Sequence, residues 1–144
     1  MKYLIIIIIV FMFSCQRECI IDNITVSENL IINSNGYCEL LSDALNGDKK
    51  SIEKICLMEF HGSVGYDHGY VLVNLINKIG TEQFMNSLKD LDYNQKQILK
   101  SYIDIGLIYE PNKNDKLNEI DFNKINLFLE NKWAVWAYAM DGCL

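Results

Sequence analysis

From residue 36 onwards, apolar residues recur at the spacing of one face of an α-helix. Tyr37, Leu41 and Ala44 belong to the first such stripe, with the i, i+4, i+7 spacing of an amphipathic helix. Further stripes lie within residues 52–60, 71–79, 84–91, 98–105 and 122–140. The pattern predicts an all-α domain over residues 36–144, folded as a compact bundle of five to six short helices.

Polar residues and glycines indicate where these helices begin and end. Asp48 and Asp67 stand where a side chain can cap the second and third helices, as aspartate often does. Asn94 and Gln97 have the spacing of a capping box at the start of the fifth helix. Gly106 follows the fifth stripe, where a C-terminal glycine is common. We therefore expect each helix to end close to its own apolar stripe.

The last stripe, from Phe122 to Met140, predicts a helix of about 20 residues. A strand over residues 133–140 is the alternative. The preceding loop contains oxygen donors from Asn112 to Asp115. It lacks the glycine and the spacing of an EF-hand, so no calcium site is predicted there.

The N-terminal segment differs from the rest of the chain in its unbroken apolar run. Lys2 precedes ten apolar residues from Leu4 to Phe13, whereas a transmembrane helix needs about 20. A leading lysine, a short apolar run and the small Ser14 are typical of a secretory signal peptide. Residues 1–14 are therefore predicted to be a signal peptide and residues 15–35 a tether, with one short strand over residues 24–32 as an open alternative.

Ser14-Cys15 resembles the lipobox of bacterial lipoproteins, although Met12 and Phe13 stand where that family prefers leucine and a small residue. The resemblance implies that Cys15 is acylated, for example with palmitate, and becomes the first residue of the mature protein. Gln16 in place of aspartate implies the outer membrane, with the domain facing the periplasm or the cell surface. Secretion to the periplasm and an uncleaved anchor are the alternatives.

Composition and charge narrow the classes of partner. With 144 residues, of which 50% are hydrophobic, the chain has room for one domain and is not mainly disordered. Without residues 1–14 it has 12 Lys and Arg against 19 Asp and Glu, a net charge of −7. Binding to nucleic acid is not expected, because phosphate contacts require a basic face.

Five cysteines suggest disulfide bonds. If Cys15 carries lipid, four remain in an oxidising compartment. Cys38 and Cys56 would come level in a hairpin of the first two helices, so we expect a Cys38–Cys56 bridge and a second one from Cys19 to Cys143. Buried free thiols at Cys38 and Cys56 are the alternative. The spacings match no zinc pattern.

Residues 59–69 concentrate the side chains that could carry chemistry, including both histidines. His61, Asp67 and His68 could supply metal ligands. Ser63 could act as a nucleophile with a histidine base, but there is no G-x-S-x-G elbow. A helix that begins near Asp67 could hold an anion, but the loop has no lysine or arginine.

We favour a simpler interpretation, in which Asp67 caps a helix and His68 lies in its exposed first turn. The loop with His61 and Tyr66 could then contact a protein partner. The predicted function is a lipid-anchored envelope protein with a non-catalytic protein-interaction module, without cofactor or metal. By analogy of size and compartment, one form is an immunity-type inhibitor of a toxin. The alternative is a metal-dependent or hydrolytic envelope enzyme that uses His61, Asp67 and His68.

Overall fold

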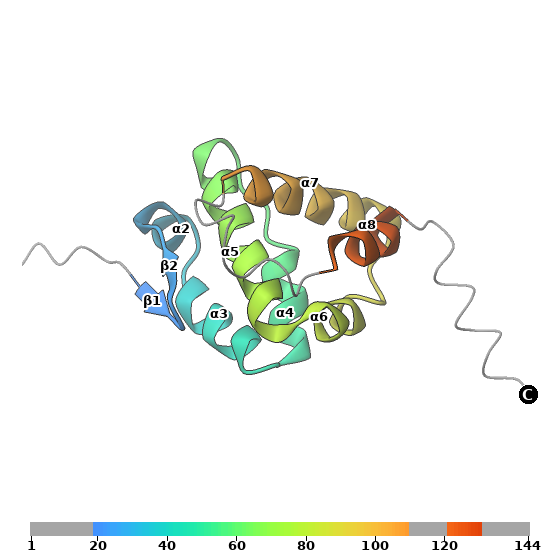
Figure 1. The fold of residues 1–144 in the computed structure, drawn as a ribbon. Helices are drawn as coiled ribbons and strands as arrows, with labels where there is room; N and C mark the ends of the chain where they lie inside the picture. Colours follow the sequence, from blue (N-terminus) through green and yellow to red (C-terminus); the bar gives the residue numbers. More distant parts are fainter. Residues whose placement is uncertain (1–18, 110–120, 131–144) are drawn as a thin grey trace, which may run out of the picture.

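The computed structural model describes residues 19–109 and 121–130. This part of the chain folds into seven helices and one two-stranded sheet, so the predicted all-α class is confirmed (Figure 1). No helix among these residues is long and apolar enough to cross a membrane. The elements in order are β1 (Cys19–Ile21), β2 (Ile24–Val26), α2 (Glu28–Asn33), α3 (Tyr37–Leu45), α4 (Lys49–Cys56), α5 (Ser63–Ile79), α6 (Thr81–Ser87), α7 (Tyr93–Tyr109) and α8 (Phe122–Glu130).

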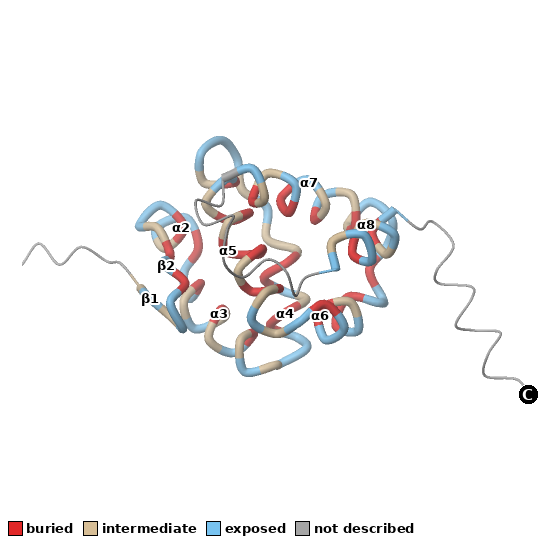
Figure 2. Tube along the Cα trace, viewed as in Figure 1, coloured by how far each residue is buried: buried red, intermediate tan, exposed pale blue. Residues whose placement is uncertain are grey.

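Helix α5 is the central element of the domain. It contacts α2, α3, α6, α7 and strand β2, and Figure 2 shows buried residues along most of its length. Val71, Leu72, Val73, Leu75 and Ile76 are all fully buried. A helix that is apolar on more than one side must be covered on several sides, which explains its place inside the bundle.

The largest helix–helix interface in the described part of the chain joins α5 to α7. A Cβ atom on Gly69 would overlap the carbonyl oxygen of Tyr102 and lie 3.0 Å from the nitrogen of Gly106. A Cβ atom on Gly106 would overlap the carbonyl group of Gly69. The prediction that Gly106 ends its helix is wrong, because α7 continues to Tyr109. The glycine allows close backbone contact instead.

Replacing Gly69 with alanine is expected to lower the free energy of unfolding by about 3 kcal/mol or more, because the new methyl group meets backbone that cannot move aside. Gly65→Ala in the same helix is the matched control. Its Cβ would lie 3.3 Å from the ring of Tyr102 and 3.4 Å from the carbonyl oxygen of Phe60. These contacts require shifts of only a few tenths of an ångström, and alanine's higher helix propensity partly offsets them. Urea unfolding measures both, and equal stabilities would contradict the proposed role of Gly69.

Residues 19–33 were expected to be part of a tether, but they fold against the helices. Asp22 and Asn23 have positive φ angles of 49° and 66°, as a two-residue type I′ hairpin turn requires. Ile24 and Leu30 are buried in the core. The three-residue strands and the six-residue helix α2 are too short to produce a recognisable period in the sequence.

The N-terminal cap of α4 is the predicted residue, whereas the capping box of α7 lies two residues earlier than predicted. The carboxylate of Asp48 accepts a 2.8 Å hydrogen bond from a backbone N–H in the first turn of α4, as predicted. A reciprocal capping box precedes α7, but it joins Asp92 to Gln95, with two hydrogen bonds of 2.9 Å, rather than Asn94 to Gln97. Helix α8 confirms the first half of the predicted 122–140 helix. Residues 112–115 and 133–140 lie outside the described residues.

Both predicted disulfide pairings are wrong. Cys19 is bonded to Cys38, with their Cα atoms 6.4 Å apart. Helices α3 and α4 do pack together, but α3 also contacts β1, and Cys38 meets that strand. Cys56 is a buried free thiol in the core, where burial raises its pKa. Cys143 lies outside the described residues.

Replacing both Cys19 and Cys38 with serine is expected to lower the free energy of unfolding by about 3 kcal/mol, because the bridge closes a loop of about 20 residues in the unfolded chain. Urea unfolding measures the loss. As a direct check, alkylating the unreduced, denatured protein should label Cys56 and leave Cys19 and Cys38 unlabelled. Alkylated Cys38 without reductant would contradict the pairing.

Candidate functional site

Helix α5 starts earlier than predicted, and this changes the role of two candidate residues. It begins at Ser63, and Gly62 is the N-cap, with φ 62°. Asp67 therefore lies within the helix and caps nothing. Its carboxylate accepts a 2.6 Å hydrogen bond from the hydroxyl of Ser27 at the start of α2. His68, which we expected in an exposed first turn, points into the core and is fully buried.

His68 lies in an aromatic cluster that it forms with Tyr37, Phe60 and Tyr102. Its Nδ1 atom is 2.8 Å from the hydroxyl of Tyr37. The ring centroids of Phe60 and Tyr102 are each 4.9 Å from the imidazole centroid, and the Tyr102 ring stands edge to face. Nε2 has no hydrogen-bond partner among the described residues. The imidazole is thus enclosed by aromatic rings with one of its two nitrogens paired.

Burial determines the protonation of this cluster. It lowers the pKa of His68 to about 3 and raises the pKa of Tyr37 well above its usual value, because the charged form of each group loses its hydration. Both groups are therefore neutral near pH 7. A buried, neutral imidazole packs and orients its neighbours, and it cannot exchange protons with a substrate in solvent.

Tyr102 connects the cluster to the loop that precedes α5. Its hydroxyl accepts a 2.7 Å hydrogen bond from the backbone N–H of Phe60 and donates one of 2.9 Å to the carbonyl oxygen of the same residue. Both backbone groups of Phe60 are thereby satisfied by a side chain from α7. This pair of bonds fixes the loop in position against that helix.

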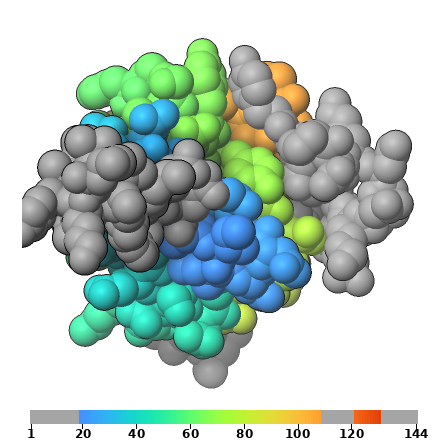
Figure 3. All heavy atoms as spheres, turned by 90° about the vertical axis from the view of Figure 1, so that its left-hand side faces the viewer, coloured from blue at the N-terminus to red at the C-terminus, as the bar shows by residue number. Residues whose placement is uncertain are grey.

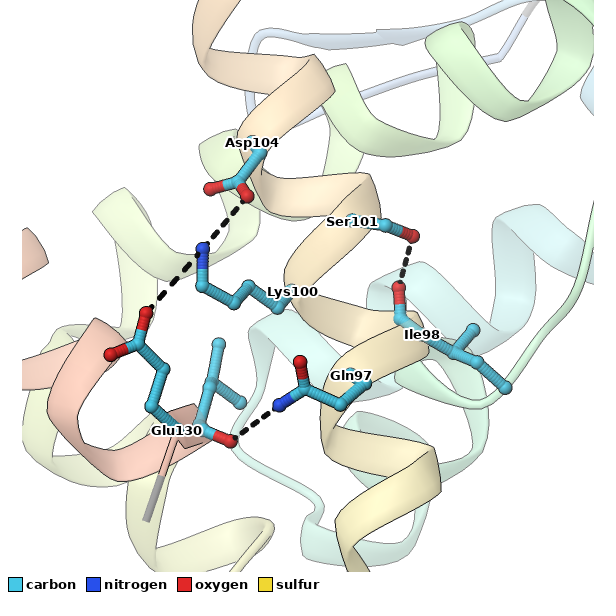
Figure 4. Close-up of polar contacts among 7 residues, drawn as sticks. Gln97, Ile98, Lys100, Ser101, Asp104 and Glu130 are labelled. Carbon is cyan, nitrogen blue, oxygen red and sulfur yellow. Dashed lines mark hydrogen bonds and ion pairs between the residues drawn. The ribbon is translucent and has the colours of Figure 1, made fainter.

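An open pocket of about 310 Å³ lies between this loop and α7. None of the described residues that line it is an aspartate, glutamate, lysine or arginine. The hydroxyl of Ser101 donates a 2.6 Å hydrogen bond to the carbonyl oxygen of Ile98 in its own helix (Figure 4), so it is already paired. The lining residues are Phe60, His61, Gly62, Gly65, Tyr66, Ile98, Ser101, Tyr102 and Ile105.

The same helix carries a polar edge that joins it to α8, as Figure 4 shows. Lys100 Nζ lies 2.9 Å from the carboxylate of Asp104 and 3.9 Å from that of Glu130. The hydrogen bond to Asp104 raises the pKa of Lys100. The side-chain amide of Gln97 donates a 3.1 Å hydrogen bond to the carbonyl oxygen of Leu129. These contacts place charged groups on α7 beside the apolar pocket.

The structure does not bring the three predicted catalytic or metal-binding residues together. His61 is exposed and lines the pocket, Asp67 is bonded to Ser27, and His68 is buried in the aromatic cluster. In the described ranges, no group of three or more His, Cys, Asp or Glu side chains is placed to hold a metal ion. Of the predicted loop residues, His61 and Tyr66 share one surface.

The sequence does not reveal how the residues of this site are connected. Tyr37 lies on the first apolar stripe and Tyr102 within the stripe of residues 98–105. These positions correctly predict burial but indicate no hydrogen-bond partner. The polar partners lie 31 and 42 residues away in the chain. A buried tyrosine usually needs a partner for its hydroxyl, and this was the one available signal.

The described residues define a mostly α-helical domain with an N-terminal β-hairpin. Comparison with protein-family models, curated proteins and solved structures finds no match to this chain. A fold does not by itself specify a function. The role of this domain must therefore be inferred from the chemistry of its surfaces.

The pH dependence of stability tests the buried state of His68. The unfolded chain binds a proton at this residue below about pH 6.5, whereas the folded protein does so only near pH 3. Stability should therefore fall as the pH drops below 6.5, by about 2 kcal/mol between pH 7 and pH 5. Urea unfolding at several pH values measures this slope.

His61 provides the matched control, because it is the second histidine and is exposed. His61→Gln should keep the slope. His68→Asn, whose amide group can still form a hydrogen bond with the hydroxyl of Tyr37, should be less stable at pH 7 but should lose most of the slope. An unchanged slope in His68→Asn would show that His68 is not the titrating group.

Proposed function

We propose that this protein is a lipid-anchored protein of the bacterial envelope whose helical domain is a non-catalytic protein-interaction module. The anchor is supported by the signal-peptide pattern of residues 1–14 and by Ser14-Cys15. The cysteine is followed by Gln16, which favours the outer membrane. The interaction surface is the pocket that α7 forms with the loop before α5 and the first turn of α5, together with its rim.

The chemistry of the pocket is the observation that carries this proposal. Its lining is mainly apolar and aromatic, Tyr66 and Ile98 are exposed at its rim, and the polar groups of Ser101 and Tyr102 are paired within the protein. Such a surface can receive an apolar side chain of a partner.

Two features indicate the chemistry of the partner. The pocket accepts one aromatic or branched apolar side chain, the kind of anchor residue that dominates protein interfaces. Asp104, about half exposed next to Lys100, and the net charge of −7 would favour basic residues around that anchor. A secreted toxin that an immunity-type protein inhibits is one partner of this kind.

A photo-crosslinking amino acid in place of Ser101 is expected to trap a protein partner in intact cells, because residue 101 lines the pocket. The same amino acid at Lys50, exposed on α4, is the positional control and should not trap that protein. The products are compared by gel shift and mass spectrometry.

A second substitution makes this test specific. Ile98→Asp introduces a charge at the pocket rim without filling the core and should abolish the Ser101 crosslink. Lys50→Asp should leave it intact. Unfolding curves verify that both variants are folded. A crosslink that survives Ile98→Asp, or one that forms equally from position 50, would contradict the pocket as the interaction surface.

A further inference from the structure

We infer that the hairpin end of the domain rests on the phospholipid bilayer, with Ile20 and Ile32 in contact with its interface. This inference rests on the proposed acylation of Cys15 and adds an orientation of the domain. It concerns β1, β2 and α2, which lie together at one end of the molecule (Figure 1). Figure 3 views the molecule from this side.

The first observation is the exposure of two large apolar side chains at this end. Ile20 in β1 is 66% exposed and Ile32 in α2 is 64% exposed. Leu30 in α2 is fully buried, and Ile21 in β1 packs partly buried against the core, so each of these two short elements carries a core side and an exposed isoleucine. Ile20 and Ile32 thus give this end of the domain two exposed apolar side chains, which can contact the apolar part of a bilayer interface.

The second observation is the short distance along the chain between the lipid and the fold. Only Gln16, Arg17 and Glu18 separate Cys15 from Cys19, the first residue of β1. Four residue steps span at most about 14 Å when fully extended. An acyl chain on Cys15 lies within the bilayer, so the hairpin cannot move further than this from the lipid. The hairpin end is therefore the part of the domain that the anchor holds nearest to the membrane.

The third observation is that the hairpin is firmly attached to the rest of the domain. The Cys19–Cys38 disulfide joins its first residue to α3. An ion pair of 3.2 Å links Asp22 in its turn to Lys78 near the end of α5. The lipid therefore restrains the whole domain rather than one loosely attached strand, and the restraint defines an orientation.

None of the described residues that line the pocket belongs to β1, β2 or α2, so the inferred membrane contact uses other side chains than the proposed interaction surface. Two isoleucines bind a bilayer only weakly on their own, so the contact should depend on the acyl chain.

The test uses the acylated full chain, purified from membranes and reconstituted into phosphatidylcholine vesicles that contain a phospholipid with a diazirine in its acyl chain. Illumination labels side chains that reach the apolar interface, and peptide mass spectrometry locates the label. We expect the label on residues 19–33. Peptides with Ile108 and Leu127, which are 70% and 69% exposed elsewhere on the domain, serve as internal controls and should remain unlabelled.

Variants show whether the two isoleucines make the contact. Ile20→Ser with Ile32→Ser should reduce the label on residues 19–33 at least five-fold, while Leu127→Ser should leave it unchanged. All three positions are exposed, so the variants are expected to fold, and thermal unfolding verifies this. Equal labelling of residues 19–33 and of the Leu127 peptide would overturn the inferred orientation, as would no label on residues 19–33.

The mass of the N-terminal peptide separates this inference from the proposed function on which it rests. If Cys15 is acylated and residues 19–33 are not labelled, the anchor stands and only the orientation is overturned. If Cys15 carries no lipid, the anchor and the orientation are both overturned. Acylated Cys15 with label confined to residues 19–33 supports both.

Discussion

The backbone contact between Gly69 and Gly106 is the constraint on which the rest of the domain depends. It brings the axes of α5 and α7 closer than any side chain would allow. At this separation the ring of Tyr102 packs against His68, and its hydroxyl reaches the backbone of Phe60. The aromatic cluster, the position of the loop before α5 and the pocket between that loop and α7 all depend on this contact.

The polar groups of the aromatic cluster differ in how completely they are hydrogen-bonded. Tyr102 both donates and accepts a hydrogen bond, whereas His68 finds a partner among the described residues for one ring nitrogen only. A buried polar atom without a partner is unfavourable, so close packing around the imidazole has to offset its lost hydration. The imidazole must stay neutral, because no carboxylate of the described residues compensates a positive charge at this position.

The sequence was sufficient for most helices because their apolar stripes are local, whereas tertiary contacts determined the features that it missed. Gly106 has the local signature of a helix end but packs against another glycine. Asp67 looks like a helix cap, yet it binds Ser27, 40 residues away. Cys38 pairs with a cysteine in a strand of three residues. Spacing along one segment contains no information on such partners.

The hairpin and the pocket are joined to the same central helix by different means. A hairpin of two three-residue strands is not stable alone, and it is held by the Cys19–Cys38 bond, the Ser27–Asp67 hydrogen bond and an ion pair to α5. The pocket is held by aromatic packing at His68 and by the backbone contact at Gly69 of the same helix. Because one 17-residue helix supports both, a fixed position of the hairpin relative to a membrane would also fix the direction in which the pocket faces.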